Sequence, residues 1–262
     1  MLVSTIASAL ETWAPPPFAE SYDNVGLLVG DPNMEVSGVL INLDMTEEVV
    51  EEAMSLGYNM IVAHHPIWFM PRKRLNGEDY VSRTIIKAIK HDIALYACHT
   101  NLDNVLSGVN QRICQKLGLT NLEFLKPTPR HSDVQIGSGM IGSLEIPIPK
   151  KAFLEFVKQT FHCGGIRYAD SLHEEIQTVA VCGGAGSFLI QEARKSKADA
   201  FVTADITYHK FFDSEGELLL LDIGHYESEQ FTSELIHEFI SKKFLNFAVR
   251  LSEVKTNPIK YF

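Results

Sequence analysis

Histidine and carboxylate side chains gather at three places in this sequence, each directly after a run of apolar residues. The three clusters are His64-His65, His99 with Asp103, and His225 with Glu229. Neutral imidazole and carboxylate groups are the ligands that zinc and related divalent metals accept in proteins. If the fold brings the three clusters into one crevice, the sequence predicts a site for divalent cations there.

The spacing within two of these clusters bears on how they would bind metal. Adjacent side chains on a strand point to opposite faces, so His64 and His65 could each reach a different ion. If the strand has already ended, both rings instead turn to the same side. His225 and Glu229 are four residues apart. A helix that begins near Glu227 would place both on one side, about one turn apart.

Other polar residues near strand ends leave more than one interpretation open. His99 is either a further ligand or the donor that orients Asp103, and we favour the second because Asp103 lies past a turn. Asp205, with His209 after it, either caps a helix or forms the wall of a pocket. The glycine turn at 183–187 could offer backbone amides to an anion, although such turns also serve tight packing.

The elements that carry these residues alternate between strands and helices. Predicted strands cover residues 36–44, 59–66, 92–103, 178–184, 198–205, 217–225 and 247–254. Predicted helices cover residues 4–13, 47–57, 83–91, 108–119, 150–161, 187–197 and 228–244. This alternation predicts an α/β fold whose mostly parallel or mixed sheets are covered by helices. Such folds bind ligands at the carboxyl ends of their strands.

A change of composition divides the chain, whose 262 residues suffice for one large or two modest domains. Prolines and glycines are frequent in the middle, which we interpret as a linker into a smaller structure with strands. We predict a first α/β lobe at 1–125, a connecting smaller structure at 126–177, and a second α/β lobe at 178–262 that packs back on the first.

Charge and composition exclude several classes of protein. The net charge of −10 argues against direct nucleic-acid binding, which depends on Lys and Arg. No apolar run reaches the roughly 20 residues of a membrane helix, and the first residues lack the basic start of a signal peptide. We therefore expect a cytoplasmic protein. The four cysteines form no C-x-x-C pair, so we expect buried thiols rather than disulfides or a cysteine zinc site.

Six stretches of the sequence together resemble one known family. They are SYDNVGLLVGDP (21–32), IVAHHPIWF (61–69), ACHTNLDNVLSGVN (97–110), VAVCGGAGSFL (179–189), AFVTADITYH (200–209) and DIGHYESEQ (222–230). The sequence resembles the Nif-three-like proteins, also called GTP cyclohydrolase 1 type 2 homologues or YbgI-like dinuclear metal-centre proteins. It departs from their pattern at Tyr22, where Trp is usual, and at Ala204, where Gly is usual.

The resemblance implies a fold, a metal centre and an assembly. It implies two intertwined α/β lobes, with two divalent ions (Zn, Fe, Mn, Ni or Co) in the crevice between them. The implied ligands are His64, His65, Asp103, His225 and Glu229, and the implied pocket residues are Asp23, Asn24 and Asp205. It also implies a toroidal homohexamer, and a chain of this length would be the short form of the family, without the domain inserted in the middle.

The function we infer from this site is metal-assisted hydrolysis. A bound divalent ion lowers the pKa of its water from about 15.7 towards about 7, and a second ion roughly 3.5–4 Å away holds the electrophile or leaving oxygen. Glu229 or Asp103 would bridge the ions, and His99 or His209 would move protons. The family name points to opening of a purine ring in a small-molecule substrate such as a nucleotide. The alternatives are hydrolysis of another substrate, such as a phosphoester, and a metal-binding scaffold without turnover.

Overall fold

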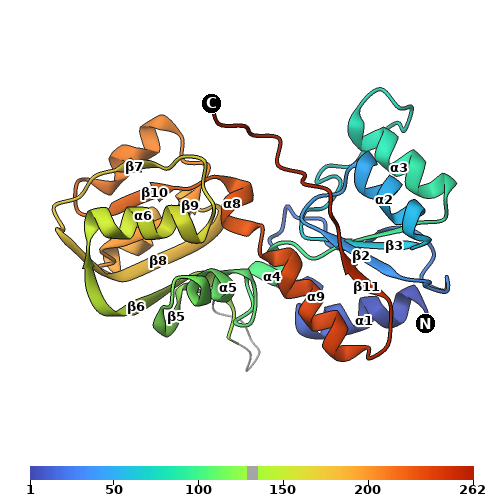
Figure 1. Ribbon diagram of the computed structural model, residues 1–262, viewed down its shortest axis with the longest axis horizontal. Helices are drawn as coiled ribbons and strands as arrows, with labels where there is room; N and C mark the ends of the chain where they lie inside the picture. The colour runs from blue at the N-terminus through green and yellow to red at the C-terminus, as the bar shows by residue number, and fades with distance from the viewer. Residues whose placement is uncertain (129–134) are drawn as a thin grey trace. The chain divides into compact units, whose positions relative to one another are not determined.

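The protein folds into two compact units, each built around one mixed sheet (Figure 1). The structure is a computed structural model that describes residues 1–128 and 135–262. The first unit comprises Met1–Leu102 and Thr232–Asn257, and the second comprises Asp103–Phe231 and Pro258–Phe262. The α/β class expected from the sequence is therefore confirmed. The chain leaves the first unit after residue 102 and returns to complete it near its end.

The sheet of the first unit has four parallel strands and one antiparallel edge strand. In spatial order the strands are β1 (Gly26–Val29), β4 (Ala94–Ala97), β3 (Met60–Ala63), β2 (Val39–Asn42) and β11 (Val249–Leu251). Only β1 runs antiparallel to its neighbour. Every residue of β2, β3 and β4 is buried, as expected for parallel strands covered on both faces.

Helices cover both faces of this first sheet (Figure 1). They are α1 (Val3–Trp13) and α9 (Thr232–Lys243) on one face, and α2 (Glu47–Leu56) and α3 (Tyr80–Lys90) on the other. The Trp13 ring stacks on Phe239 at 4.3 Å between ring centroids, which joins α1 to α9. Thr46 caps α2 by accepting from the Val49 amide, and Gly57 ends that helix at φ 69°.

The sheet of the second unit combines a parallel centre with antiparallel edges. Its order is β5 (Thr120–Pro127), β6 (Gly137–Pro149), β8 (Glu175–Ala185), β9 (Ala200–Ala204), β10 (Leu219–Asp222) and β7 (Arg167–Ala169). Strands β8, β9 and β10 are parallel, and the other pairings are antiparallel. Its helical elements are α5 (Val109–Lys116), α6 (Lys150–Thr160), η2 (Ser187–Leu189), α7 (Ile190–Lys195), η3 (Tyr208–Ser214) and α8 (His225–Glu229). In the described parts of the chain, no helix has the length and apolar character needed to cross a membrane.

The middle of the chain differs from the linker predicted there. Strand β6 is 13 residues long and pairs with both β5 and β8, so it is an integral part of the second sheet. Its glycines have a packing reason, because a Cβ added at Gly142 would lie 2.8 Å from the Thr120 carbonyl oxygen. The unit boundaries therefore differ from the predicted divisions at 125/126 and 177/178. The helix predicted at 228–244 is also divided, into α8 and α9.

The core of the second unit gives the first testable prediction. Phe201 on β9 is fully buried, whereas Phe188 in η2 is 56% exposed. Replacing Phe201 with Ala should lower the free energy of unfolding by about 3–5 kcal/mol, because apolar contacts are lost and a cavity remains. Chemical denaturation measures this loss. Phe188→Ala is the matched control and should cost far less; equal losses would contradict the described core.

Candidate metal centre

The first unit brings polar residues together where its parallel strands end. Strands β2, β3 and β4 are in register, with Asn42 beside Ala63 and Ala63 beside Ala97. The residues that follow these strands therefore emerge at one edge of the sheet. They include Asp44 after β2, the pair His64-His65 after β3, and His99 after β4.

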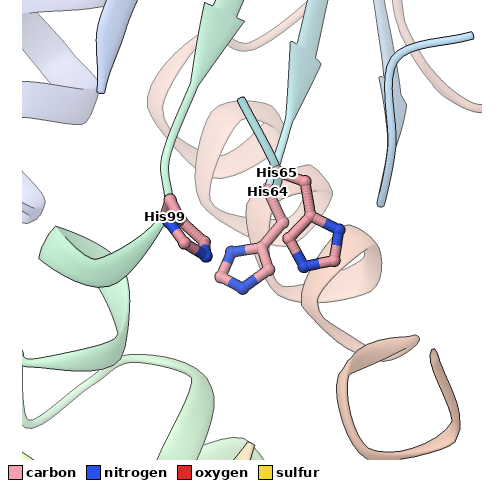
Figure 2. Close-up of side chains that lie close together, drawn as sticks. All are labelled: His64, His65 and His99. Atoms are coloured by element: carbon pink, nitrogen blue, oxygen red, sulfur yellow. The ribbon is translucent and has the colours of Figure 1, made fainter. Parts of the chain in front are cut away.

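The three histidine rings at this edge lie side by side (Figure 2). We call His64, His65 and His99 the histidine cluster. Ring centroids are 4.9 Å apart for His64 and His65, 5.2 Å for His64 and His99, and 5.5 Å for His65 and His99. Each ring offers a nitrogen, and the three nitrogens lie within 4.8 Å of one another. His64 is fully buried and the other two are half-buried, so the cluster can hold a metal ion.

An oxygen atom holds the Nδ1 of every ring in the histidine cluster. The partner of His64 is the Cys98 carbonyl oxygen at 2.7 Å. The partners of His65 and His99 are Asp44 Oδ1 at 2.7 Å and Asp23 Oδ1 at 2.8 Å. When Nδ1 donates its proton to oxygen, Nε2 carries the lone pair that binds metal. The donor set therefore fits a divalent cation.

The surroundings of Asp23 keep its carboxyl group ionised, so that it can accept the hydrogen bond from His99. Burial alone would raise the pKa of its carboxyl group. The hydrogen bond and charge of His99, with hydrogen bonds from Thr100, outweigh burial and lower the pKa to about 2. The neighbouring Asn24 donates from Nδ2 to the Trp68 carbonyl oxygen at 3.0 Å. Two of the three residues assigned to the pocket from the sequence, Asp23 and Asn24, thus lie beside His99 and the segment that follows His65.

Asp44 is a candidate site residue that the sequence patterns did not reveal. Burial raises the pKa of its carboxyl group, but hydrogen bonds from His65 and from the Thr256 hydroxyl lower it overall. Asp44 is the last residue of the predicted strand 36–44. The other candidate residues were chosen because they lie at the ends of predicted strands, so the same criterion could have found Asp44. Thr256 comes from the last residues of the first unit, and no local sequence signal connects it with Asp44.

The second unit repeats the arrangement at the ends of β8, β9 and β10. Ala185 pairs with Ala204, and Asp222 pairs with Thr203, so these strand ends also share one edge. His225 directly begins α8, two residues earlier than predicted. Gly224 precedes it at φ 94°, a conformation that favours glycine.

The His225 ring lies between two carboxylates. Its Nδ1 is 2.7 Å from Asp205 Oδ2, and its Nε2 is 3.1 Å from Glu229 Oε2. Burial lowers the pKa of the imidazole, but the Glu229 charge and the Asp205 hydrogen bond outweigh it and raise the pKa to about 11. Two carboxylates on either side of one imidazole favour a positive charge there, and a metal ion can take the place of the proton.

Asp103 lies close to this group of residues. Burial raises the pKa of the Cys182 thiol most strongly, and the negative charges of Asp103 and Glu229 raise it further. Both carboxylates are therefore near one buried sulfur atom. We call Asp103, Asp205, His225 and Glu229 the carboxylate cluster.

The glycines Gly183 and Gly184, at the end of β8, pack against the carboxylate cluster. A Cβ added at Gly184, where φ is 60°, would lie 2.5 Å from Glu229 Oε1. The Gly183 amide donates to Asn110 Oδ1 at 3.0 Å, and the Gly184 amide donates to Ser228 Oγ at 2.9 Å. These two amides already have partners, and close packing accounts for the glycine at position 184.

Asp205 and His209 have different surroundings. The Asp205 side chain bonds His225, and η3 begins after Thr207 without a side-chain cap, so the structure favours the site over helix capping. Asp205 itself has φ 54°, whereas Ala204 has an ordinary φ and costs no strain there. His209 is exposed and lies among aromatic rings, 5.2 Å from Tyr208 between centroids.

Asp222 is a second residue that the sequence did not reveal. It is 5% exposed, and its Oδ2 accepts from the Ile206 amide while its Oδ1 accepts from the Gly224 amide. Arg167 from β7 pairs with the same carboxylate. Asp222 therefore joins the loop that carries Asp205 to the turn that carries His225.

The structure thus gathers the predicted residues into two clusters. His64, His65 and His99 form the first, with Asp23 and Asn24 beside them. Asp103, Asp205, His225 and Glu229 form the second, and His209 lies on the surface of η3. That His99 orients Asp103, and that five ligands from both clusters hold the same two ions, remain predictions.

Comparison with known proteins gives consistent matches over nearly the whole chain. The family described as Duf34/NIF3 (NGG1p interacting factor 3) matches residues 1–258. A "GTP cyclohydrolase 1 type 2 homolog" of Clostridium perfringens is 35% identical over 230 residues, which cover 87% of each chain. A protein of the same name from Streptococcus pneumoniae is 34% identical and is matched over 100% of both chains.

A solved structure shows the same fold. A hypothetical protein of Staphylococcus aureus has a TM-score of 0.91 and 30% sequence identity, covering 100% of this chain and 99% of that chain. The mixed α/β fold expected from the resemblance is therefore confirmed for the described residues.

The contact between Thr256 and Asp44 gives the second prediction. Replacing Thr256 with Val removes the hydroxyl that helps hold Asp44 against His65, so metal affinity should fall by about tenfold. Competition with a chromophoric chelator for Co²⁺ measures this affinity. Thr256→Ser keeps the hydroxyl and should restore it. If the Val and Ser variants bind Co²⁺ equally, the hydroxyl has no part in positioning His65.

The raised pKa of His225 gives the third prediction. Below about pH 11 the metal-free imidazole keeps its proton, so a metal must displace that proton in order to bind. Zinc binding at about pH 8 should therefore release a proton from His225, and affinity should rise with pH. Calorimetry in buffers of different ionisation enthalpy counts the protons. Asp205→Asn should reduce the release, and unchanged proton release in His225→Gln would contradict the assignment.

Proposed function

This chain belongs to the Duf34/NIF3 family, and from that premise we propose that it is a metal-dependent hydrolase with two divalent ions per chain. The proposed ligands are His64, His65, Asp103, His225 and Glu229, with Zn, Fe, Mn, Ni or Co as the metal. A small molecule is the proposed substrate, and opening of a purine ring, as the relatives' names suggest, is the proposed reaction. A homohexamer in the cytoplasm completes the proposal.

One observation carries this proposal most strongly. Three histidine rings meet at one sheet edge, and each has its Nδ1 held by an oxygen atom. Histidines that ligate metals almost always show this outer hydrogen bond, which fixes the tautomer and the direction of the ring in the proposed ligands His64 and His65. In His99 the same bond fixes the ring that is proposed to transfer protons. Histidines that serve only in packing have no reason to share it three times at one place.

The residues of the site have distinct parts in the proposed reaction. A bound divalent ion would supply a water molecule acidic enough to give hydroxide near neutral pH. Asp23, ionised because its pKa is about 2, holds His99 in one orientation, so that Nε2 can accept or return a proton. Glu229 is 3% exposed, and its burial limits the water that would screen a charge beside it. His209 is the second candidate for proton transfer.

Two alternatives would give different results in the same experiment. A hydrolase of another substrate would cleave phosphoesters or cyclic amides and leave GTP unchanged. A metal-binding scaffold would keep its ions and turn over no substrate. The protein reconstituted with each metal in turn, and assayed on GTP, phosphoesters and cyclic amides, separates these alternatives.

The fourth prediction concerns metal content. His65→Ala and Glu229→Ala should each lose at least one ion per chain, because each removes a proposed ligand; plasma emission spectroscopy on the purified variants measures this. His91→Ala is the control, since His91 is exposed and outside both clusters. Full metal content in both ligand variants would refute the proposed ligand set.

His99→Gln should keep the metal and lower turnover by about a hundredfold.

A further inference from the structure

The segment that follows β11 takes part in both units. The Thr256 hydroxyl bonds Asp44 within the first unit, whereas Pro258–Phe262 belong to the second unit. We call Pro258–Phe262 the C-terminal segment. Its Tyr261 is about half exposed, and the rest of that side chain packs against the second unit. The surroundings of Tyr261 therefore show what this segment does for the carboxylate cluster.

The Tyr261 ring packs on a pair of glycines between α6 and β7. A Cβ added at Gly164 would lie 2.5 Å from Tyr261 Cγ and closer still to the neighbouring Cδ2. A Cβ added at Gly165 would lie 3.6 Å from Tyr261 Cδ1, which is ordinary van der Waals contact. Neither glycine has a positive φ, so the main chain at both positions would accept alanine. The ring therefore lies directly on the main chain of Gly164, where a side chain would displace it.

The Tyr261 hydroxyl lies at the turn that carries His225. A Cβ added at Gly224 would lie 3.1 Å from the Tyr261 hydroxyl oxygen and would overlap the Glu227 carboxylate. Burial raises the pKa of the Tyr261 hydroxyl, and negative charges that include Glu227 and Asp222 raise it further. These contacts place Tyr261 against the residues on both sides of Gly224.

The turn at Gly224 decides where the His225 ring points. Gly224 has φ 94°, and its carbonyl oxygen accepts from the Ser228 amide at 3.0 Å within α8. A change of the dihedral angles at this turn would rotate the start of α8, and the His225 imidazole would move away from Asp205 and Glu229. Because glycine has no Cβ, its main chain has more alternative conformations than that of other residues. A neighbouring side chain that fills the space beside Gly224 removes some of these alternatives.

We propose that Tyr261 is a positioning residue of the carboxylate cluster: it packs on Gly164, closes the space beside Gly224, and so fixes the direction in which His225 meets a cation. This inference rests on the proposed function, which it deepens by adding a residue that acts on the metal through a ligand. Residues that orient a ligand in this way change metal affinity by about ten- to a hundredfold when they are replaced.

The two neighbouring glycines offer a matched test. Gly164→Ala places a methyl group where the Tyr261 ring lies and should displace the ring, whereas Gly165→Ala adds the same group at ordinary contact distance. Competition with a chromophoric chelator should show Co²⁺ affinity about tenfold lower in Gly164→Ala and in Tyr261→Ala, and unchanged in Gly165→Ala. The double variant Gly164→Ala/Tyr261→Ala should lose no more affinity than Tyr261→Ala alone, because both substitutions act through one contact.

Tyr168 provides a second control within the same unit. It is 50% exposed, compared with 48% for Tyr261, so the same substitution removes a similar side chain from a similar environment. Tyr168→Ala should leave Co²⁺ affinity unchanged. Equal losses in Tyr168→Ala and Tyr261→Ala would overturn the proposal, because loss of any half-exposed tyrosine from the unit would then explain the effect. Equal affinities in Gly164→Ala and Gly165→Ala would overturn it as well.

Hydrogen exchange of the metal-free protein separates positioning from general stabilisation. In Tyr261→Ala the amides of residues 224–229 should exchange roughly tenfold faster, while the strands of the second unit keep their exchange rates. Faster exchange throughout the unit would show a purely structural role and overturn the proposal. Unchanged exchange at the turn, or faster exchange there without loss of Co²⁺ affinity, would overturn it too.

Failure of the proposed function gives a different result. If the unmodified protein binds no Co²⁺, the proposed metal centre is wrong before any substitution is made, and the positioning role of Tyr261 is refuted with it. If the unmodified protein binds Co²⁺ and the Tyr261 and Gly164 variants bind it equally well, the metal centre stands and only the role of Tyr261 is refuted.

Discussion

The histidine cluster depends on one hydrogen bond made three times, between a ring Nδ1 and an oxygen atom. A free imidazole can rotate and can carry its proton on either nitrogen, and this bond removes both freedoms. The acceptors come from different parts of the first unit: the main chain at Cys98, the end of β2 at Asp44, and the segment before β1 at Asp23. Ring orientation is therefore a property of the folded unit rather than of any one segment.

Parallel strands explain why these residues meet at all. In both sheets, three adjacent parallel strands run in register. Strands β3 and β4 lead into the histidine cluster, and strands β9 and β10 lead into Asp205 and His225 of the carboxylate cluster. Apolar strands covered on both faces cannot accommodate such residues within their length, so the polar groups collect at the carboxyl ends. Helix α8 adds Glu229 by placing it one turn after His225.

The sequence predicted those strands and site residues that have a local pattern in the chain. Apolar runs that end in His or Asp identified β3, β4, β9 and β10 and the side chains that follow them. The strand order could not be predicted, and neither could Thr256 beside Asp44 or Arg167 beside Asp222, because these contacts join distant parts of the chain. Strand β6 was missed because its glycines and prolines are typical of a linker, although Gly142 is required by close packing against β5.

The path of the chain affects how the protein folds as it is made. The first unit needs α9 and β11, which lie beyond residue 231, whereas almost all of the second unit lies between residues 103 and 231. A ribosome adds about 5–20 residues per second, so the second unit can close while the first still exposes the edge of β2 and the apolar side of α1. The segment made first is thus completed last, and during that interval its uncovered sheet edge and apolar surface are open to aggregation.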